Sequence, residues 1–507
     1  MRSRTRWYAR VAWWATVAVS CVGGSACDGA VVRADGGGSP DGASDERDGS
    51  TLRDGSTRRD GSTPRDASSS PDGSSARDGG AVDPIPTIPA IEPWTPRACG
   101  AGVECVSSLQ TIQAAVDRVS SGGVVQIAAG TYRENVVVRG KRVLVIGGFS
   151  ADFSTWDPNA HPTRVEAPSG TIFTLDDASG SRLQGLVIHG GTGSCRMYYG
   201  CDGGGVYATG GSYDILGNVI EASRVPGIND EGGGIYLDGG GRIQGNLIRD
   251  NEAGKGAAMA VFYGSEMLIA DNVVEDNRGL GDHGGGLYVA GRGEVTVARN
   301  LIRRNAIGVE AGYGWGGGAI LFGSSLRGRL YGNVFEANHA PSTGSGLFID
   351  EDASAVSEND LFFDNTCPSD GGSAIYVDEG PDGGTRFELI NATIAGNCRT
   401  SAVYLDGICS VEVRNSIIVD VTDPIEIEDT GTIAISYSLI EGGFAGPGNI
   451  DADPMFEDPA ADDYRLRAGS PAIDAADPVD AYDREPPPNG GRRDLGHTGN
   501  TTEATRS

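Results

Sequence analysis

A short glycine-rich phrase recurs eight times in the central part of the chain and constrains the fold more than any other feature. Six copies read GGGVYATG, EGGGIYLD, HGGGLYVA, TGSGLFID, GGSAIYVD and TSAVYLDG, and two more read KGAAMAVF and WGGGAILF. The small residue before the apolar pair gives spacings of 29, 24, 28, 32, 28, 28 and 28, because it falls at Gly205, Gly234, Ala258, Gly286, Gly318, Gly346, Ala374 and Ala402. A unit of this length cannot bury its own apolar face and must stack on its neighbours. The repeat therefore predicts a solenoid.

A second pattern, with an apolar residue three positions before each Asn, runs through the same repeats. Its copies are Ile243, Asn246, Ile248, Asn251; Ile269, Asn272, Val274, Asn277; Val297, Asn300, Ile302, Asn305; and Leu330, Asn333, Phe335, Asn338. Asn tolerates the left-handed backbone of a tight bend, and its amide can bond the equivalent amide one turn away. We expect stacked Asn columns with a structural role and no catalytic one.

The segment before the repeats predicts a cap. In LQTIQAAVDRV, after Ser107-Ser108, the residues Leu109, Ile112, Val116 and Val119 share one helical face. A β-rich stretch with the phrase GTYREN follows. Helix, GTYREN phrase and repeats together resemble the pectin-lyase-like superfamily over roughly residues 98–450, which implies an all-β, right-handed parallel β-helix. The pairing of GGGxY with FEAN (335–338) also resembles the repeats of polymorphic outer-membrane proteins, and residues 147–165 resemble bacterial β-helix surface proteins.

The N-terminal sequence predicts export and a tether. Basic MRSRTRWYAR and apolar VAWWATVAV form a signal peptide over residues 1–20, and the sequence up to Cys21 resembles a bacterial lipobox. Lipidation of Cys21 is the expectation, with plain cleavage near Ser25 as the alternative. Residues 21–93 are rich in Asp, Gly, Ser and Arg, which predicts a disordered linker. The β-helix is expected over 94–450, followed by a C-terminal cap and frayed tail over 451–507. The expected location is extracellular or the bacterial outer-membrane surface.

Six cysteines are expected to form disulfides. Cys99 with Cys105 and Cys195 with Cys201 are each six residues apart, which suits local bridges. Cys367 and Cys398 follow equivalent Asn positions in adjacent turns, so their Cα atoms should lie about 5 Å apart. Cys27 and Cys409 are left without partners. Such bridges fit an oxidising compartment.

Strand alternation predicts one outward face that carries aromatic and acidic columns. If Ile235 and Leu237 point into the core, Tyr236 and Asp238 point outward together. Sugar rings stack on aromatic faces and their hydroxyls bond carboxylates, so the face is a candidate glycan-binding strip. The alternative is a ring stack that only stabilises the sheet, or one that is covered by a loop or by the C-terminal tail. The candidate binding residues are Tyr207, Tyr236, Tyr288, Phe348, Tyr376, Tyr404, Asp238, Asp350, Asp378 and Asp406.

Charge and missing motifs exclude several function classes. A formal net charge of −29 argues against nucleic acid. The five His and the absence of a CxxC motif give no support to a zinc or haem site. No cofactor is expected, although an anionic polysaccharide would require calcium as a bridge. GTYRE resembles the first motif of pectin methylesterases, but the other sequence motifs of that family are absent. The set of sequence motifs typical of polygalacturonases is also absent. Asp238, Asp350 and Asp378 are weak catalytic candidates.

The sequence favours a non-catalytic, surface-exposed β-helix that binds glycans or another surface component. Its only expected contact with a membrane is the lipid anchor. A polysaccharide lyase or glycoside hydrolase with a divergent site on the same face is the second hypothesis, and a structural spacer is the third.

Overall fold

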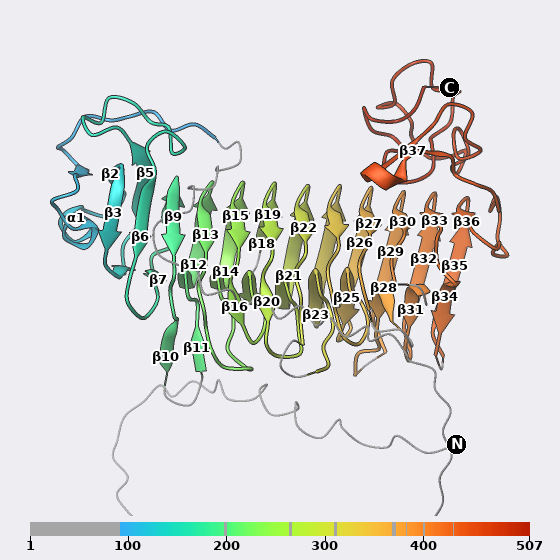
Figure 1. The fold of residues 1–507 in the computed structure, drawn as a ribbon, viewed down its shortest axis with the longest axis horizontal. Coiled ribbons are helices and arrows are strands. Elements are labelled where there is room, and N and C mark those ends of the chain that lie inside the picture. Colours follow the sequence, from blue (N-terminus) through green and yellow to red (C-terminus); the bar gives the residue numbers. More distant parts are fainter. Residues whose placement is uncertain are drawn as a thin grey trace, which may run out of the picture. The chain divides into compact units, whose positions relative to one another are not determined.

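The computed structural model describes residues 92–196, 200–262, 266–308, 312–367, 372–381, 383–398, 401–428 and 430–506. The expected signal peptide, Cys21 and nearly all of the expected linker lie outside the described residues. Within them, three rows of parallel strands wind around one core, as the repeat predicts (Figure 1).

The first row contains strands whose outward side chains include the tyrosines of the repeated phrase. Its strands are β4 Val136–Arg139, β7 Phe173–Asp176, the first half of β12 Val206–Leu216, the first half of β14 Ile235–Gln244, β17 Met259–Phe262, the first half of β21 Leu287–Ala298, the first half of β23 Ala319–Tyr331, β25 Leu347–Asp350, β28 Ser373–Val377, β31 Ser401–Leu405 and β34 Asp423–Ile427.

The second row continues each turn after a bend. It comprises the second halves of the four long strands together with β1 Val103–Val106, β2 Gly123–Ala128, β5 Val143–Phe149, β8 Arg182–Gln184, β18 Glu266–Ala270, β26 Ser354–Glu358, β29 Arg386–Ile390, β32 Ser410–Arg414 and β35 Thr432–Ser436.

The third row is a separate parallel sheet of twelve strands. They are β3 Gly130–Arg133, β6 Thr163–Glu166, β9 Leu186–His189, β13 Val219–Glu221, β15 Leu247–Arg249, β19 Val273–Glu275, β22 Leu301–Arg303, β24 Val334–Glu336, β27 Leu361–Phe363, β30 Thr393–Ala395, β33 Ile417–Ile418 and β36 Leu439–Ile440. Three small pairs stand outside the rows: β10 Ser194–Arg196 with β11 Gly200–Asp202, β16 Glu252–Ala253 with β20 Arg278–Gly279, and β37 Phe456–Asp458 with β38 Asp463–Leu466.

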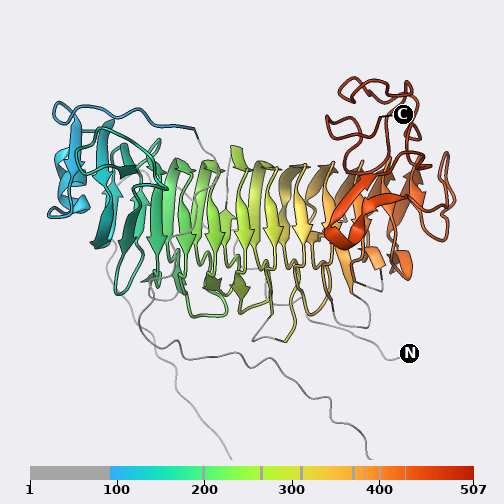
Figure 2. The same cartoon turned by 45° about the horizontal axis from the view of Figure 1, so that its top comes forward.

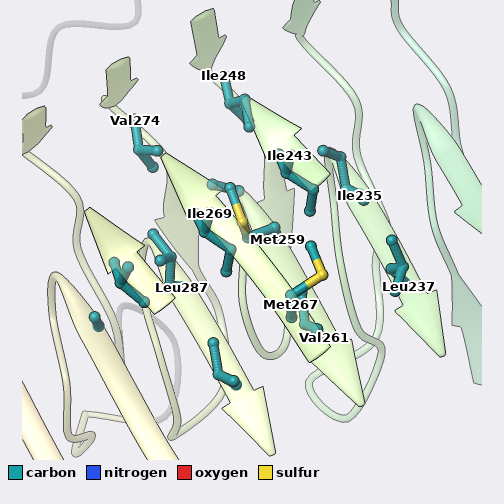
Figure 3. Packing of buried hydrophobic residues seen from close by; sticks show 14 of the residues in the cluster. Ile235, Leu237, Ile243, Ile248, Met259, Val261, Met267, Ile269, Val274 and Leu287 are labelled. Carbon is teal, nitrogen blue, oxygen red and sulfur yellow. The ribbon is translucent and has the colours of Figure 1, made fainter. Parts of the chain in front are cut away.

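Inward side chains of the three rows form one continuous apolar core. Ile235, Leu237 and Ile243 of β14 pack against Met259, Val261 and Ile269 of the next turn (Figure 3). These residues are the apolar members of the two sequence patterns, so alternate positions face the core as period-2 patterning requires.

Two buried amide columns line the core, as expected. In one, Asn218, Asn246, Asn272, Asn300 and Asn333 each donate to the next side chain at 2.9–3.1 Å. In the other, the donors are Asn251, Asn277, Asn305, Asn338 and Asn365, at 2.8–3.0 Å. The left-handed backbone lies one residue earlier than expected, for example at Asp271 (φ 57°) before Asn272. The amides therefore satisfy buried backbone groups, and their neighbours make the bend.

The cap helix α1, Ile112–Arg118, is shorter than expected. Thr111 is its N-cap, and the Glu134 carboxylate accepts from the backbone N–H groups of Ile112 and Gln113 at 2.7 and 2.9 Å. The expectation that Leu109 lies on the buried face was wrong, because the helix begins beyond it and Leu109 is 96% exposed.

The C-terminal segment packs along the side of the third row (Figures 1 and 2). Phe456, Tyr464 and Leu495 share an apolar cluster with side chains of β27, β30, β33 and β36. Asn391 donates to the carbonyl of Asp494 at 2.9 Å. A frayed tail was expected toward the C-terminus; in the structure Leu495 is buried, and the backbone N–H of His497 donates to the Thr393 hydroxyl of β30 at 3.1 Å.

All three expected disulfides are present. The Cα atoms of Cys367 and Cys398 lie 5.4 Å apart, which confirms the register expected for these turns. Cys99–Cys105 and Cys195–Cys201 are the two local bridges. Cys409 is free and buried, and Cys27 lies outside the described residues.

Candidate functional site

The aromatic residues of the repeated phrase form one column on the outward side of the first row. Strand pairing places Tyr207 beside Tyr236, and Phe348 beside Tyr376 and then Tyr404. Ala260 and Ile320 hold the equivalent positions on either side of Tyr288. The side chains form a cluster separate from the core, so the alternation argument placed them on the correct side of the strand.

Most rings of this column are buried despite pointing away from the core. Tyr207, Tyr288, Phe348 and Tyr376 are 5, 6, 2 and 5% exposed. The rings contact one another: centroids lie 5.0 Å apart for Tyr207 and Tyr236, and 4.7 Å for Phe348 and Tyr376. These four rings therefore build a second apolar layer and leave little surface for a ligand.

The accessible aromatic surface lies at the central turns, partly on residues outside the predicted column. Tyr236, Phe262, Trp315 and Phe322 are half-buried at the edge of the cluster. The ring of Phe262 lies 5.4 Å from that of Tyr236 and 5.5 Å from that of Tyr288. Tyr313, next to Trp315 at 5.9 Å, is 51% exposed. These rings form an apolar surface that crosses β14 to β23, which we call the ring patch.

The predicted acidic column is split into two parts. Asp238 stands apart, because Phe262, Ala290 and Phe322 follow it at the same strand position. Asp350 is next, opposite Phe322, and the backbone bonds of Asp378 and Asp406 to the preceding turn place those residues in line after it. The structure therefore brings Asp350, Asp378 and Asp406 together and leaves Asp238 beside the ring patch.

Burial and mutual repulsion shape the acidity of this part of the face. Burial, with the Asp378 charge, raises the pKa of Asp350 to about 8. Burial, with the Asp406 charge, raises the pKa of Asp378 to about 7. The Tyr376 hydroxyl donates to Asp406 at 3.0 Å, and burial raises the pKa of Tyr376. The weak catalytic candidates Asp350 and Asp378 thus carry protons readily near neutrality.

A bridging calcium ion would need a cluster of acidic ligands on this face. Across the described ranges, no group of three or more His, Cys, Asp or Glu side chains has an arrangement that could hold a metal ion.

A mixed-charge cluster that the sequence analysis missed borders the ring patch. Glu231, Lys255 and His283 each precede the first glycine of the repeated phrase, and strand bridges join Glu231 to Lys255 and His283 to Trp315. The Lys255 ammonium lies 3.9 Å from the Asp282 carboxylate and 5.9 Å from the centroid of the Tyr288 ring. The signal was in the sequence: the residue before each GGG-type phrase varies between acid, base and aromatic types, unlike the phrase itself.

The mixed-charge cluster (Glu231, Lys255, Asp282 and His283) holds groups suited to acid–base chemistry. Burial, with the charge of Asp202, raises the pKa of Glu231 to about 7, although Lys255 opposes the shift. Asp282 and the Nδ1 of His283 lie 2.7 Å apart. Burial opposes ionisation of Asp282, but the hydrogen bond from His283 lowers the pKa of that carboxyl overall. The Nδ1 bond fixes the ring orientation and leaves Nε2 as the available ring nitrogen.

Comparison with known proteins assigns the architecture. A sequence model of the family described as right handed beta helix region matches residues 176–451, which is 276 of the 507 residues. The chain belongs to the right-handed β-helix family. The expected fold class, an all-β right-handed parallel β-helix, is thereby confirmed. No curated protein matched the chain.

Solved structures similar to this β-helix protein include three with low overall similarity. The pectate lyase Pel9A has 14% identity and a TM-score of 0.38, with 78% of this chain and 95% of that chain covered. XylC, described in complex with xylose, has 10% identity and a TM-score of 0.36, with 68 and 76% covered. An alginate lyase from Paenibacillus sp. str. FPU-7 has 14% identity and a TM-score of 0.31, with 67 and 99% covered. At these values the neighbours carry no argument about activity.

A charged group of this β-helix protein lies on the third row, away from the first. Arg249 of β15 pairs there with Glu221 at 3.0 Å. His189 bonds the same glutamate, at 3.2 Å. Among the described residues, no helix is long and apolar enough to cross a membrane.

Proposed function

We propose that this β-helix protein binds a saccharide along the outward side of its first row, centred on the ring patch. The observation that carries the proposal is the contact between half-buried rings and the mixed-charge cluster: His283 lies 5.5 Å from Trp315 and 6.0 Å from Phe322 between ring centroids. The C–H faces of a pyranose stack on such rings, and its hydroxyls bond acids, amines and imidazoles.

The buried rings of the column have a supporting role in this proposal. Tyr288 and Phe348 fill the space beneath the patch, and each buried aromatic pair adds about 0.5–1.5 kcal/mol beyond its area burial. They hold the half-exposed rings in fixed positions, which lowers the entropic cost of binding.

The proposed setting is the cell surface. Lipidation of Cys21 and the linker over 21–93 would hold the folded part away from the membrane, so that a polysaccharide or another surface component can reach it. The three disulfides of the folded part support an oxidising compartment outside the cytoplasm.

The test is retention of the full chain on immobilised polysaccharides. Trp315→Ala and Phe322→Ala should each lower the affinity about tenfold or more, since each removes a stacking surface at the patch. Ile408→Ala is the control, because Ile408 is an exposed apolar side chain away from the patch. Equal retention of all four proteins would disprove binding at the patch.

Cleavage of the bound saccharide is a second candidate, favoured by one observation. Glu231, with a pKa of about 7, pairs with Lys255 across a strand bridge, and His283 is held by the Asp282 carboxylate; such groups are suited to general acid–base work at neutral pH. Purified full chain would be incubated with a polysaccharide panel while unsaturated products and reducing ends are followed. Product that Glu231→Gln abolishes would establish an enzyme, and the absence of product from the wild type would leave a binding protein.

A further inference from the structure

The Tyr288 hydroxyl is a polar group at the ring patch that makes no hydrogen bond to another described residue. The side chain is 6% exposed, and its ring lies 5.5 Å from that of Phe262 and 6.1 Å from that of Phe322. Ala260 and Ile320 hold the equivalent positions of the adjacent turns, and neither side chain extends as far as a phenol hydroxyl. The hydroxyl is not among the fully buried polar atoms that lack a partner, so it keeps contact with solvent. It therefore offers a ligand an unused donor and acceptor.

Four carboxyls from neighbouring turns lie near this hydroxyl. Burial, together with their charges, raises the pKa of Tyr288. They belong to Glu231, Asp282, Asp350 and Glu351. Asp282 precedes His283, whose ring lies 6.1 Å from that of Tyr288, and Asp350 pairs with Phe322 of the preceding turn. The structure thus brings acids from three different turns to one unpaired hydroxyl.

Basic side chains compensate these carboxyls only in part. The Lys255 ammonium and the His283 ring both engage Asp282, at 3.9 and 2.7 Å. Asp350 and Glu351 form no ion pair with another described residue. Two of the four carboxyls therefore have acidic and aromatic neighbours and no cation in contact.

The outward side of the third row differs in this respect. Glu221 accepts from Arg249 at 3.0 Å, and Glu275 accepts from Arg303 at 2.7 Å, each from the paired position of the next turn. At Asp350 the paired residue of the preceding turn is Phe322, an aromatic residue where the third row has a charged partner. The uncompensated negative charge is thus a feature of the ring patch, and a cation supplied by a ligand would neutralise it.

A protonated amine matches this arrangement better than a sugar hydroxyl does. An ammonium group has three N–H donors and no acceptor, whereas carboxylates and an unpaired phenol oxygen accept hydrogen bonds. Aromatic faces such as those of Trp315 and Phe322 also attract cations. The rings and the carboxyls therefore favour the same chemical group.

We propose that the saccharide bound at the ring patch is a polymer of amino hexoses with free amines, one of which docks between the Tyr288 hydroxyl and the Glu351 carboxylate. The proposal rests on the proposed saccharide binding and names the class of saccharide. The pyranose ring stacks on Trp315 and Phe322, while its ammonium group supplies the cation that this face lacks. N-acetylation removes that charge, so an acetylated polymer is a weaker ligand.

The test uses the full chain and three hexaoses with the same β-1,4-linked backbone, and isothermal titration calorimetry at pH 6.5 measures the affinities. Glucosamine hexaose carries ammonium groups, whereas N-acetylglucosamine hexaose carries acetamides and cellohexaose carries hydroxyls at the same carbon. The wild type should bind glucosamine hexaose about tenfold or more tightly than the other two. Hexalysine probes attraction by the net charge of −29 alone, and should bind more weakly than glucosamine hexaose.

Two variants remove single groups from the proposed contact. Tyr288→Phe removes the hydroxyl and keeps the ring, and Glu351→Gln removes the charge and keeps the shape. Each should lower the preference for glucosamine hexaose over cellohexaose about fivefold or more. Tyr331→Phe and Glu388→Gln are the matched controls, because they remove the same groups from the outward side of the second row and should leave the preference unchanged.

The outcomes separate this proposal from the proposed function. A preference for glucosamine hexaose that both patch variants reduce and both controls keep supports the amino-sugar class. Equal affinity for the three hexaoses overturns that class and leaves saccharide binding at the ring patch. Equal affinity for hexalysine and glucosamine hexaose, or a preference that both patch variants retain, also overturns it. No binding of any hexaose overturns both proposals. If Tyr288→Phe fails to fold by circular dichroism, Glu351→Gln decides alone.

Discussion

The side-chain amide of Asn333 donates to the carboxylate of Asp360 at 3.0 Å, and this contact ends one of the two buried amide columns. Asp360 also accepts from the backbone N–H of Asn333 and from the Ser357 hydroxyl, both at 2.6 Å. Ala392 holds the equivalent position in the next turn, so the column has no further partner there. Burial raises the pKa of Asp360 to about 7. The terminal residue of the column is thus an acid in an environment that suits an amide.

Asp360→Asn should therefore stabilise the protein at pH 8. An unfolded Asp ionises near pH 4, whereas the folded one ionises near pH 7, so the native state loses stability as the pH rises between these values. An amide removes this loss and keeps the acceptor for Asn333. We expect a gain of about 1 kcal/mol or more at pH 8 and little gain at pH 5. Chemical denaturation at the two pH values measures the difference.

The reverse change in the middle of the column provides the control. Asn300 donates to the Ile269 carbonyl and to the Asn333 amide oxygen, both at 2.9 Å. Asn300→Asp loses both donors and should cost about 1–3 kcal/mol at pH 8. A stability at pH 8 that is lower in Asp360→Asn than in the wild type would contradict the assignment.

The whole rod should be more stable at mildly acidic pH than at pH 8. Burial raises the pKa values of Glu231, Asp350, Asp378 and Asp494 to between about 7 and about 8, so protons bind the folded state more tightly than the unfolded one between pH 4 and 8. Buried His497 has the opposite effect, because burial lowers its pKa to about 4. The carboxyls with raised pKa values outnumber this histidine, so their effect on stability should dominate. The midpoint of thermal unfolding, followed by circular dichroism, should be at least about 2 °C higher at pH 5.5 than at pH 8.

The repeats made the fold predictable from the sequence. The burial of the side chains on the outward side of the first row could not be predicted from it. The Gly-rich phrase fixed the register of Tyr236 with its neighbours, and alternation placed Ile235 inward. Exposure depends on the loops that precede each phrase, and those differ in length from turn to turn, as the spacings of 24 and 32 residues show. Tyr288 and Phe348 are therefore buried and support the patch, and the accessible aromatic surface belongs to Trp315 and Tyr313 instead.

The mixed-charge cluster was missed for a related reason. Glu231, Lys255 and His283 share one strand position but differ in residue type. A search for one residue type that recurs at the same position therefore did not identify them. A structural repeat keeps the backbone position constant and leaves the side chain there free to vary. Functional residues of such a fold are therefore better sought at equivalent positions whose side chains change between turns.

The Cys367–Cys398 bridge should contribute more stability than the Cys195–Cys201 bridge. The first spans 31 residues and joins adjacent turns, whereas the second spans 6 within one hairpin. Because loop-closure entropy grows with loop length, we expect removal of the first pair by Ser substitution to cost about 2–4 kcal/mol. Differential scanning calorimetry of the two double-serine variants compares them. Equal losses would show that the bridge does not restrain the stacking of turns.

The first glycine of the repeated phrase should tolerate no side chain. Gly284 has φ +68°, and an added Cβ would lie 2.7 Å from the Leu287 carbonyl oxygen. Gly284→Ala should cost about 1–2 kcal/mol for the left-handed backbone alone. Gly346→Ala is the control, since its backbone is not left-handed, an added Cβ would come no closer than 3.0 Å to a neighbour, and its position is occupied by Ala258 and Ala374 in other turns. Denaturant titration should show the larger loss for Gly284→Ala, and an equal or smaller loss would contradict the assignment.

Lys255 should hold the acidity of Glu231 within the physiological range. Burial and Asp202 raise the pKa of Glu231 to about 7, and Lys255 is the cation that limits the rise. In Lys255→Met the apolar stem remains while the charge is lost, so the pKa of Glu231 should move further upward. Titration of ¹³C-labelled glutamate carboxyls by NMR measures the change, with Glu231→Gln to assign the signal. Arg224→Gln is the control, because Arg224 pairs with Glu252 at 3.2 Å and not with Glu231. An unchanged Glu231 titration in Lys255→Met would show that the mixed-charge cluster is not electrostatically coupled, and cleavage at neutral pH would lose its physical basis.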